Sequence, residues 1–365
     1  MPEVFKLLAL PGDGIGPEIV ESALSVLEVA CAGSAFEVKV ETALIGGAAT
    51  KATGVPLPDA TLDAARGSDA ILLGAVGLPE ASGWEPAVRP ERGLLKIRKE
   101  LGLFANLRPV RSDLAPEGSP LRPERGSDID MLFVRELTGG IYFGEPRERG
   151  GQGRERYAID TMRYSAWEVE RIARLGFAMA RKRRRKLCSV DKANVLASSA
   201  LWREVVDELA PQFEDVELEH RLVDACAMQL LTEAHAFDVI VTSNLFGDIL
   251  SDEASVLSGS LGLMPSASVA EVDDDGLCFG LYEPIHGSAP DIAGKGIANP
   301  IGTIASVAMM LRWSAGEFEI ADRIDAAVRA AVRSGVRTGD IAAPGESGAT
   351  TRQFTDAVIS QIRGA

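Results

Sequence analysis

The sequence predicts an α/β fold in which helices cover both faces of a mostly parallel sheet. Short apolar runs of strand length alternate along the chain with longer segments whose apolar residues recur at helical spacing. The segments 70–75 and 237–242 are predominantly apolar, as expected for strands that are buried on both faces. With 365 residues the chain exceeds one ordinary core, so we expect two domains.

Composition and charge narrow the class of protein. Apolar residues make up 46% and charged residues 25%, which is typical of a globular chain. The formal net charge of −15 argues against a nucleic-acid or membrane-surface binder, because those partners require a basic surface. The four scattered cysteines indicate free thiols in a reducing compartment. Because no apolar run has the length of a membrane span and no signal peptide is apparent, we expect a soluble cytoplasmic protein.

The chain opens with a strand, a tight turn and a helix. Residues 5–10 form a short, mostly apolar run, and from Ile19 onward apolar residues recur at helical spacing. The glycines of segment 12–16 suggest a dinucleotide-binding loop. However, Pro17 and Glu18 stand where that loop has its third glycine, and the glutamate would repel a bound pyrophosphate. We therefore interpret the glycines as a strand-to-helix turn.

The remaining elements continue the alternation. Further strands are predicted at 36–43, 70–75, 104–110, 129–134, 187–190, 216–222 and 237–242. Further helices are predicted at 57–66, 94–103, 165–186, 198–209, 224–231, 301–313 and 320–332. Turn-rich connections are predicted at 113–128, 259–267, 273–276 and 283–300. The segment 145–160 has many glycines and charges and should project as an arm, and the basic run 181–186 is interpreted as a helix end rather than a nucleic-acid site.

The segment 244–254 places two carboxylates among apolar residues. If this segment is helical, Asp248 and Asp252 lie one turn apart on the same face, where their charges repel. Such a pair either faces solvent or binds a hard cation such as Mg²⁺ or Mn²⁺, which prefers oxygen ligands. The two aspartates alone leave both interpretations open.

Three arginines and two further side chains are also candidates for chemistry. Arg98, Arg108 and Arg135 would suit a substrate with two carboxylates if they lay together, although each could instead pair with a nearby glutamate such as Glu100 or Glu136.

Lys192 lies in an Asp-Lys-Ala-Asn turn and is either a surface charge or, when partly desolvated near a cation, a proton acceptor. Tyr142 could act in proton transfer or could simply pack against its neighbours.

Four motifs together resemble the isocitrate/isopropylmalate dehydrogenase family of metal-dependent β-decarboxylating dehydrogenases. They are RELTGGIYFG at 135–144, VDKANVL at 190–196, NLFGDILSDEA at 244–254 and HGSAPDIAGKGIANP at 286–300. The resemblance runs nearly end to end with the motifs in the family's order. It implies a three-layer fold in which two domains share a central sheet. The first domain would be discontinuous, at 1–103 and 259–365, and the second would span 104–258 with a dimer arm at about 144–163.

The resemblance implies roles for the candidate residues. Substrate would be bound by Leu94, Arg98, Arg108, Arg135 and Asp224. Asp224, Asp248 and Asp252 would hold Mg²⁺ or Mn²⁺. NAD⁺ would be bound by Leu78, Glu91, His286, Gly287, Ser288, Ala289, Asp291, Ile292 and Asn299. In the family the residues that match Lys192 and Asp224 reach into the partner subunit's site, so the resemblance also implies a homodimer.

The activity implied is NAD⁺-dependent oxidative decarboxylation of 3-isopropylmalate to 4-methyl-2-oxopentanoate and CO₂, in leucine biosynthesis. Lys192 would take the hydroxyl proton, and Tyr142 would return a proton to carbon after CO₂ leaves. Asp291 would accept hydrogen bonds from the adenosine ribose and repel a 2′-phosphate, which favours NAD⁺ over NADP⁺. Leu94 would face the isopropyl group.

Other functions compete with this one. Relatives of this kind could act on tartrate or D-malate, homoisocitrate or isocitrate, and the apolar Leu94 and Leu95 argue against the last two. A non-catalytic regulatory subunit of the same fold is a further alternative, against which the presence of Lys192 and Tyr142 speaks. A phosphoryl-transfer enzyme would need a Lys-Ser or Lys-Thr phosphate cradle beside its glycine loop, which segment 12–16 lacks.

Overall fold

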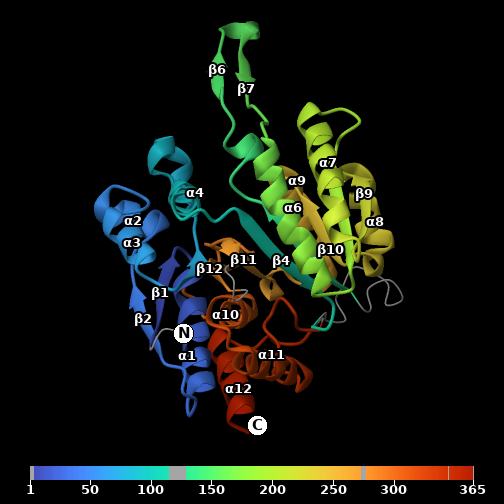
Figure 1. Cartoon of the computed structure of the whole chain (residues 1–365). Coiled ribbons are helices and arrows are strands. Elements are labelled where there is room, and N and C mark those ends of the chain that lie inside the picture. The colour runs from blue at the N-terminus through green and yellow to red at the C-terminus, as the bar shows by residue number, and fades with distance from the viewer. Residues whose placement is uncertain (1–3, 115–128, 273–276, 344, 365) are drawn as a thin grey trace. The chain divides into compact units, whose positions relative to one another are not determined.

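The computed structural model describes residues 4–114, 129–272, 277–343 and 345–364 (Figure 1). It divides into two compact units. The first contains the described residues of Met1–Leu103, Asp113–Pro120 and Ser258–Ala365, and the second contains Phe104–Ser112 and the described residues of Leu121–Leu257. The predicted turn 273–276, and the predicted loop 113–128 beyond Leu114, lie outside the described residues. Within the described ranges, no helix is long and apolar enough to cross a membrane.

The sheet of the first unit has the strand order β2-β1-β3-β12-β11. Its strands are β1 (Phe5–Gly12), β2 (Val38–Thr42), β3 (Ala70–Ala75), β11 (Pro265–Val272) and β12 (Cys278–Pro284). All neighbours pair in parallel except β11 and β12, which are antiparallel. Every residue of β3 is buried, because this strand has a partner on each edge and side chains packed on both faces.

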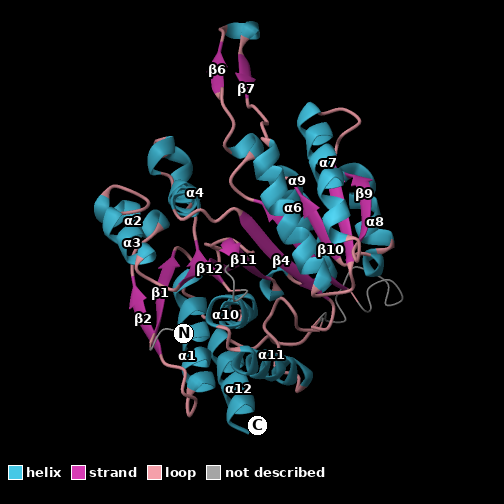
Figure 2. Cartoon of the chain, viewed as in Figure 1, coloured by secondary structure: helices cyan, strands magenta, loops and turns pink. Residues whose placement is uncertain are grey.

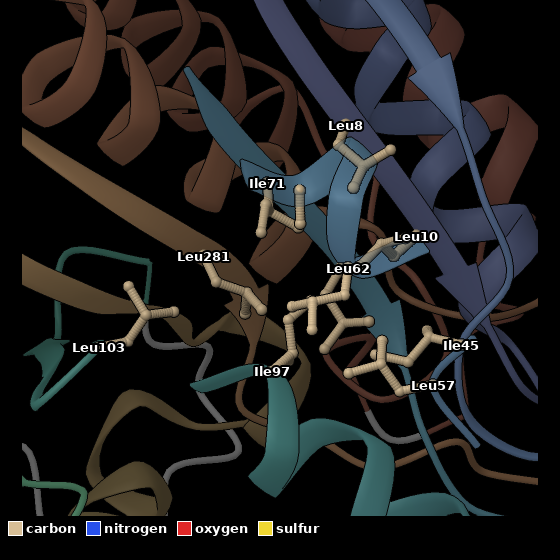
Figure 3. Close-up of a cluster of buried hydrophobic side chains, with 11 residues drawn as sticks. Leu8, Leu10, Ile45, Leu57, Leu62, Ile71, Ile97, Leu103 and Leu281 are labelled. Atoms are coloured by element: carbon tan, nitrogen blue, oxygen red, sulfur yellow. The ribbon is translucent and has the colours of Figure 1, made fainter. Parts of the chain in front are cut away.

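Helices pack against this sheet and against one another around the core of the first unit. They are α1 (Gly16–Cys31), α2 (Gly46–Thr53), α3 (Asp59–Arg66), α4 (Pro90–Glu100), α10 (Ile301–Met310), α11 (Phe318–Arg333) and α12 (Thr351–Gly364). On one face of the sheet, Leu8, Leu10 and Ile71 point toward residues of the 45–97 region (Figure 3). Those residues include Ile45, Leu57, Leu62 and Ile97. Hydrophobic burial therefore joins segments that lie far apart in sequence.

The sheet of the second unit has the order β4-β5-β10-β8-β9. Its strands are β4 (Ala105–Arg111), β5 (Asp130–Glu136), β8 (Lys186–Asp191), β9 (Glu217–Leu222) and β10 (Val239–Thr242). The β4–β5 pair is antiparallel and the other pairs are parallel. The helices α6 (Ala166–Arg181), α7 (Ala197–Leu209), α8 (Val223–Thr232) and α9 (Asn244–Ser255) complete the unit. The prediction of a mostly parallel sheet in an α/β fold is confirmed.

A hairpin projects from the second unit, as Figure 2 shows. It consists of the antiparallel strands β6 (Glu148–Gly150) and β7 (Tyr157–Ile159). Tyr157 and Ile159 on its second strand are exposed. The basic run after this hairpin lies at a helix end, as predicted, because α6 ends at Arg181 and the guanidinium of that residue pairs with Asp215.

Several elements differ from the sequence prediction. The predicted connection 259–267 contains the start of β11, and β12, α2 and α12 were not predicted. The α2 segment begins with two glycines and has no strong apolar period, so tertiary contacts fix it. In contrast, α12 buries Phe354, Val358 and Ile362 at helical spacing, which is a signal that the prediction overlooked.

Candidate active site

The two aspartates of α9 face a buried arginine. Asp248 and Asp252 lie on the same side of the helix, as predicted, and both contact Arg108, which β4 carries. The distance from Arg108 Nη1 to Asp252 Oδ1 is 2.9 Å, and from Nη2 to Asp248 Oδ1 it is 3.5 Å. The Asp248 and Asp252 side chains are 33% and 60% exposed, whereas that of Arg108 is 9% exposed. The arginine charge offsets the repulsion between the carboxylates.

A second arginine and a tyrosine complete this cluster. Arg135, near the end of β5, forms an ion pair with Asp248 Oδ1. The Tyr142 hydroxyl donates a hydrogen bond of 3.0 Å to Asp248 Oδ2, and the Tyr142 ring lies 5.8 Å from the Arg135 guanidinium carbon. Glu136, one of the predicted alternative partners of the arginines, forms an ion pair with Arg171. Two predicted substrate ligands and one predicted proton donor therefore lie around one aspartate.

The electrostatics of the cluster favour a protonated tyrosine. Burial raises the pKa of Tyr142, and the charge of Asp248 and its hydrogen bond raise it further. Burial also raises the pKa of Asp252, although Arg108 opposes the shift. The phenol thus keeps its proton at neutral pH and can donate it.

Lys192 and Asp224 form a separate pair in the second unit. Lys192 follows β8, Asp224 lies in the first turn of α8, and the lysine Nζ donates a hydrogen bond to Asp224 Oδ1. This hydrogen bond is the largest cause that lowers the pKa of Asp224. Among the described residues of one chain, no three histidine, cysteine, aspartate or glutamate side chains are grouped to hold a metal. One chain therefore brings together two of the three predicted metal ligands, and Asp224 stands apart with Lys192.

The donor chemistry of the α9 pair suits a divalent cation. Asp248 and Asp252 offer carboxylate oxygens from one helical turn, which is the ligand type that Mg²⁺ and Mn²⁺ prefer. Their two negative charges are balanced by Arg108 and Arg135. A substrate with two carboxylates would upset this balance, and a divalent cation would restore it.

Two of the predicted substrate residues belong to the first unit. Arg98 on α4 donates to Glu283 of β12, with an Nη2–Oε1 distance of 2.5 Å, and both side chains are largely buried. The predicted alternative partner, Glu100, instead accepts from Arg66. Leu94 is partly buried against the core of this unit. The contact of Leu94 and Arg98 with substrate remains a prediction.

A cavity of about 650 Å³ in the first unit gathers most of the predicted cofactor residues. Those that line it are His286, Gly287, Ala289, Ile292 and Asn299. Residues that the sequence prediction missed also line it, among them Ile15, Leu261 and Asp340. Ile15 lies inside the glycine turn and could have been noticed there, whereas no sequence signal marks Asp340.

The remaining predicted cofactor residues lie outside the lining of this cavity. Ser288 anchors the loop, because its carbonyl accepts the Ile15 N–H at 2.9 Å. Leu78 packs directly against Gly47, and Asp291 is exposed. A Cβ on Gly77 would come within 3.6 Å of Glu91 Oε1, which places Glu91 beside the loop that carries Leu78.

The donors and walls of the cavity suit a nucleoside. Asn299 Nδ2 donates to Asp340 Oδ2 at 2.9 Å, while His286 Nδ1 contacts the Gly287 carbonyl oxygen at 2.9 Å. The His286 Nε2 atom is buried and has no hydrogen-bond partner among the described residues. Burial lowers the pKa of His286, so its ring is neutral near pH 7. Apolar side chains beside an unsatisfied ring nitrogen are what a base and ribose would cover.

The glycine segment forms the turn that the sequence predicts. Gly14 has φ +58°, and a Cβ there would lie 2.0 Å from the Ser288 carbonyl oxygen. Glycine is therefore required for the turn to approach the 286–300 loop.

The chain is similar to known proteins over nearly its whole length. A family model described as isocitrate/isopropylmalate dehydrogenase matches residues 6–358. The 3-isopropylmalate dehydrogenase of Pseudomonas fluorescens (strain Pf0-1) is 56% identical over 360 residues, which cover 98% of this chain and 99% of that protein. The 3-isopropylmalate dehydrogenase of Halalkalibacterium halodurans is 52% identical over 359 residues and covers 98% of both chains. The crystal structure of isocitrate dehydrogenase from Methylococcus capsulatus aligns with a TM-score of 0.86 and 38% identity, covering 99% of this chain and 100% of that one.

Proposed function

We propose that this chain, which belongs to the isocitrate/isopropylmalate dehydrogenase family, catalyses the oxidative decarboxylation of 3-isopropylmalate to 4-methyl-2-oxopentanoate. The observation that carries the proposal is the group of two arginines, one tyrosine and two aspartates around α9. The choice of 3-isopropylmalate as substrate rests on the names of relatives that are 52–56% identical to this chain. The motifs identified in the sequence indicate the same family.

The arginines of the cluster would bind the substrate carboxylates. Arg108 and Arg135 are buried, and a planar guanidinium binds a carboxylate through two parallel hydrogen bonds. Both are now turned toward aspartates, so they are held in place before substrate arrives. Arg108 already donates to Asn106, Ser251, Asp252 and Asp248, so a substrate carboxylate would replace some of these hydrogen bonds.

Two groups that the chain would bind supply the remaining chemistry. A divalent cation held by Asp248 and Asp252, with Asp224 from a partner subunit, would acidify the substrate hydroxyl and stabilise negative charge after CO₂ leaves. NAD⁺ in the cavity of the first unit would accept the hydride. The exposed carboxylate of Asp291 supports a preference for NAD⁺ over NADP⁺, because it would repel a 2′-phosphate.

The side chains of this protein would move the protons. Oxidation removes a hydride from the carbinol carbon and a proton from its hydroxyl, and Lys192 would accept that proton at Nζ, directly or through water. Loss of CO₂ then leaves an electron pair on carbon. That carbon would take a proton from the Tyr142 hydroxyl, whose raised pKa keeps the proton available at neutral pH.

The active assembly would be a homodimer. Lys192 and Asp224 are bound to each other and would enter a partner's site together. The exposed apolar residues Tyr157 and Ile159 of the hairpin would be covered by the same partner. The absence of a third carboxylate beside Asp248 and Asp252, among the residues described in one chain, supports a site that two subunits share.

The proposal is tested by following NADH formation from a panel of 3-isopropylmalate, D-malate, tartrate, homoisocitrate and isocitrate. Each acid is tried with Mg²⁺ or Mn²⁺, with and without EDTA, and with NAD⁺ or NADP⁺. We expect the highest kcat/KM with 3-isopropylmalate and NAD⁺, and its loss in EDTA. A higher kcat/KM for another acid would show that this acid, rather than 3-isopropylmalate, is the substrate. If none of the acids is turned over in a metal-dependent way, the proposed function is overturned.

A further inference from the structure

Asn244 is a buried side chain that the proposed chemistry does not use. It is the first residue of α9, two positions after the end of β10 at Thr242, and its exposed fraction is 0%. Its side-chain oxygen accepts hydrogen bonds from Arg135 Nε at 3.1 Å and from Arg135 Nη2 at 2.8 Å. The third guanidinium nitrogen, Nη1, pairs with Asp248. The side-chain oxygen of Asn244 therefore fixes the orientation of the planar Arg135 guanidinium.

The other half of the same amide holds a turn of the backbone. Asn244 Nδ2 donates to the Leu137 carbonyl at 3.0 Å and to the Gly139 carbonyl at 3.1 Å. These carbonyls belong to the turn that leads from β5 to Tyr142. A primary amide has two donors and an acceptor, so all of its hydrogen-bonding groups are used here.

The turn is held from its other side by a buried glutamate. Glu136 accepts hydrogen bonds from the N–H groups of Thr138 at 2.9 Å and Gly139 at 2.8 Å. The Tyr164 hydroxyl donates to Glu136 at 3.2 Å and accepts the backbone N–H of Asn244 at 2.9 Å. Glu136, which holds the turn, is therefore connected through the Tyr164 hydroxyl to the backbone of Asn244.

We propose that Asn244 is a positioning residue, which orients the Arg135 guanidinium with its oxygen and the Tyr142 turn with its nitrogen. This inference rests on the proposed function for the roles of Arg135 and Tyr142, although the contacts themselves do not depend on it. The oxygen supports substrate binding, and the nitrogen supports the return of the proton to carbon. The two halves of one amide therefore act on two different steps.

Two substitutions separate the halves. Asn244→Asp keeps an oxygen acceptor for Arg135 but has no donor for the two carbonyls, and its carboxylate repels them. Asn244→Ala removes both sets of contacts. Thr242→Val is the control, because it removes a buried hydrogen bond of 2.8 Å to the Val190 carbonyl close to α9. Thr242 and Arg135 are neighbours across β10 and β5, but the Thr242 hydroxyl bonds the Val190 carbonyl rather than the Arg135 guanidinium or the turn.

Kinetics with 3-isopropylmalate, NAD⁺ and Mg²⁺ give the first measurement. We expect Asn244→Asp to lower kcat by about tenfold to a hundredfold with KM for 3-isopropylmalate within about threefold, since positioned proton transfer contributes about 10²–10⁴ in rate. Asn244→Ala should lower kcat and also raise KM. A merely structural asparagine would lower the melting temperature in both variants and leave kcat and KM of the folded fraction equal to those of the wild type.

Amide hydrogen exchange without any ligand gives the second measurement. Peptides that cover 137–144 should exchange faster in both Asn244 variants than in the wild type or in Thr242→Val. Unchanged exchange in this segment would overturn the inference even if activity fell. If the wild type turned over none of the acids, the proposed function would fail, and the exchange result would still decide whether Asn244 holds the turn.

Discussion

At the residue scale, the site depends on the sharing of Asp248 among several donors. It accepts from Arg135, Arg108 and Tyr142, and it stands one helical turn from Asp252. The Asp248 carboxylate therefore forms ion pairs with both arginines and a hydrogen bond with the tyrosine. Substitutions at this residue and at Tyr142 should affect different steps.

Replacing Tyr142 with phenylalanine should slow decarboxylation more than oxidation. The substitution removes the hydroxyl that would return a proton to carbon but keeps the ring beside Arg135. A loss of about 10²–10⁴ in the decarboxylation step is expected for a positioned proton donor. CO₂ release is measured with the oxidised keto acid supplied directly, and hydride transfer is measured as the NADH burst from 3-isopropylmalate. Equal losses in both assays would contradict this role.

Replacing Asp248 with asparagine should abolish metal-dependent turnover while the protein stays folded. The variant loses one of the two charges that balance Arg108 and Arg135, and an amide is a weaker ligand for a hard cation. Titration with Mn²⁺ followed by electron paramagnetic resonance should show weakened binding. Asp215→Asn, in an exposed pair with Arg181, is the control, and it should bind Mn²⁺ like the wild type. A normal Mn²⁺ affinity in Asp248→Asn would show that the α9 aspartates are surface charges and not metal ligands.

At the element scale, one buried aspartate joins three segments of the first unit. Asp13 follows β1, and its carboxylate accepts the N–H groups of Gly47 at 2.8 Å, Ala48 at 2.7 Å and Gly77 at 2.9 Å. The first two contacts cap the start of α2 and the third holds the loop that leads to Leu78. An element with little helical pattern of its own therefore depends on a side chain that is distant in sequence.

Replacing Asp13 with alanine should destabilise the protein by about 2 kcal/mol or more, since a hydrogen bond to a charged group contributes about 1.5–3 kcal/mol. The free energy of unfolding is measured by urea denaturation. Asp63→Ala, at an exposed position of α3, is the control and should remain near the wild type. A change in Asp13→Ala no larger than that of the control would show that the α2 start is held by other contacts.

At the scale of the whole molecule, the arrangement of Lys192 and Asp224 predicts that activity requires two subunits. They lie together and apart from the other predicted metal ligands, so each would serve a partner's site. The homodimer would have a two-fold axis, so each subunit gives and receives the same pair. Mixed dimers can test this arrangement directly.

Lys192→Ala and Asp248→Asn should each be inactive alone but should restore activity when co-expressed. In a mixed dimer with shared sites, the intact Asp248 of one subunit meets the intact Lys192 of the other at one of the two sites. Random pairing should therefore give roughly a quarter of wild-type activity for an isologous dimer. Activity is assayed as NADH formation, and the proportion of mixed dimers is checked by differential tagging. No recovery in verified mixed dimers would show that each chain carries its own Lys192.

Most strands and helices of this protein could be predicted from local sequence patterns. Alternating apolar periods indicate most strands and helices, and α9 could be recognised as a helix with Asp248 and Asp252 on one face. The four motifs indicate the family. These features depend on residues that are close together in the chain, so they can be predicted from the sequence.

The contacts between distant side chains could not be predicted, because they depend on how the elements are arranged in space. Arg98 pairs with Glu283, which lies 185 positions away, rather than with the nearby Glu100. The predicted cofactor cavity is lined by Asp340 together with a loop that begins more than fifty positions earlier, and the start of α2 is held by Asp13. Asn244 shows the same limit: its place at the start of α9 could be predicted, but its contacts with Arg135 and the Tyr142 turn could not. Such contacts arise where separate strands end side by side, and periodicity along the chain carries no information about that meeting.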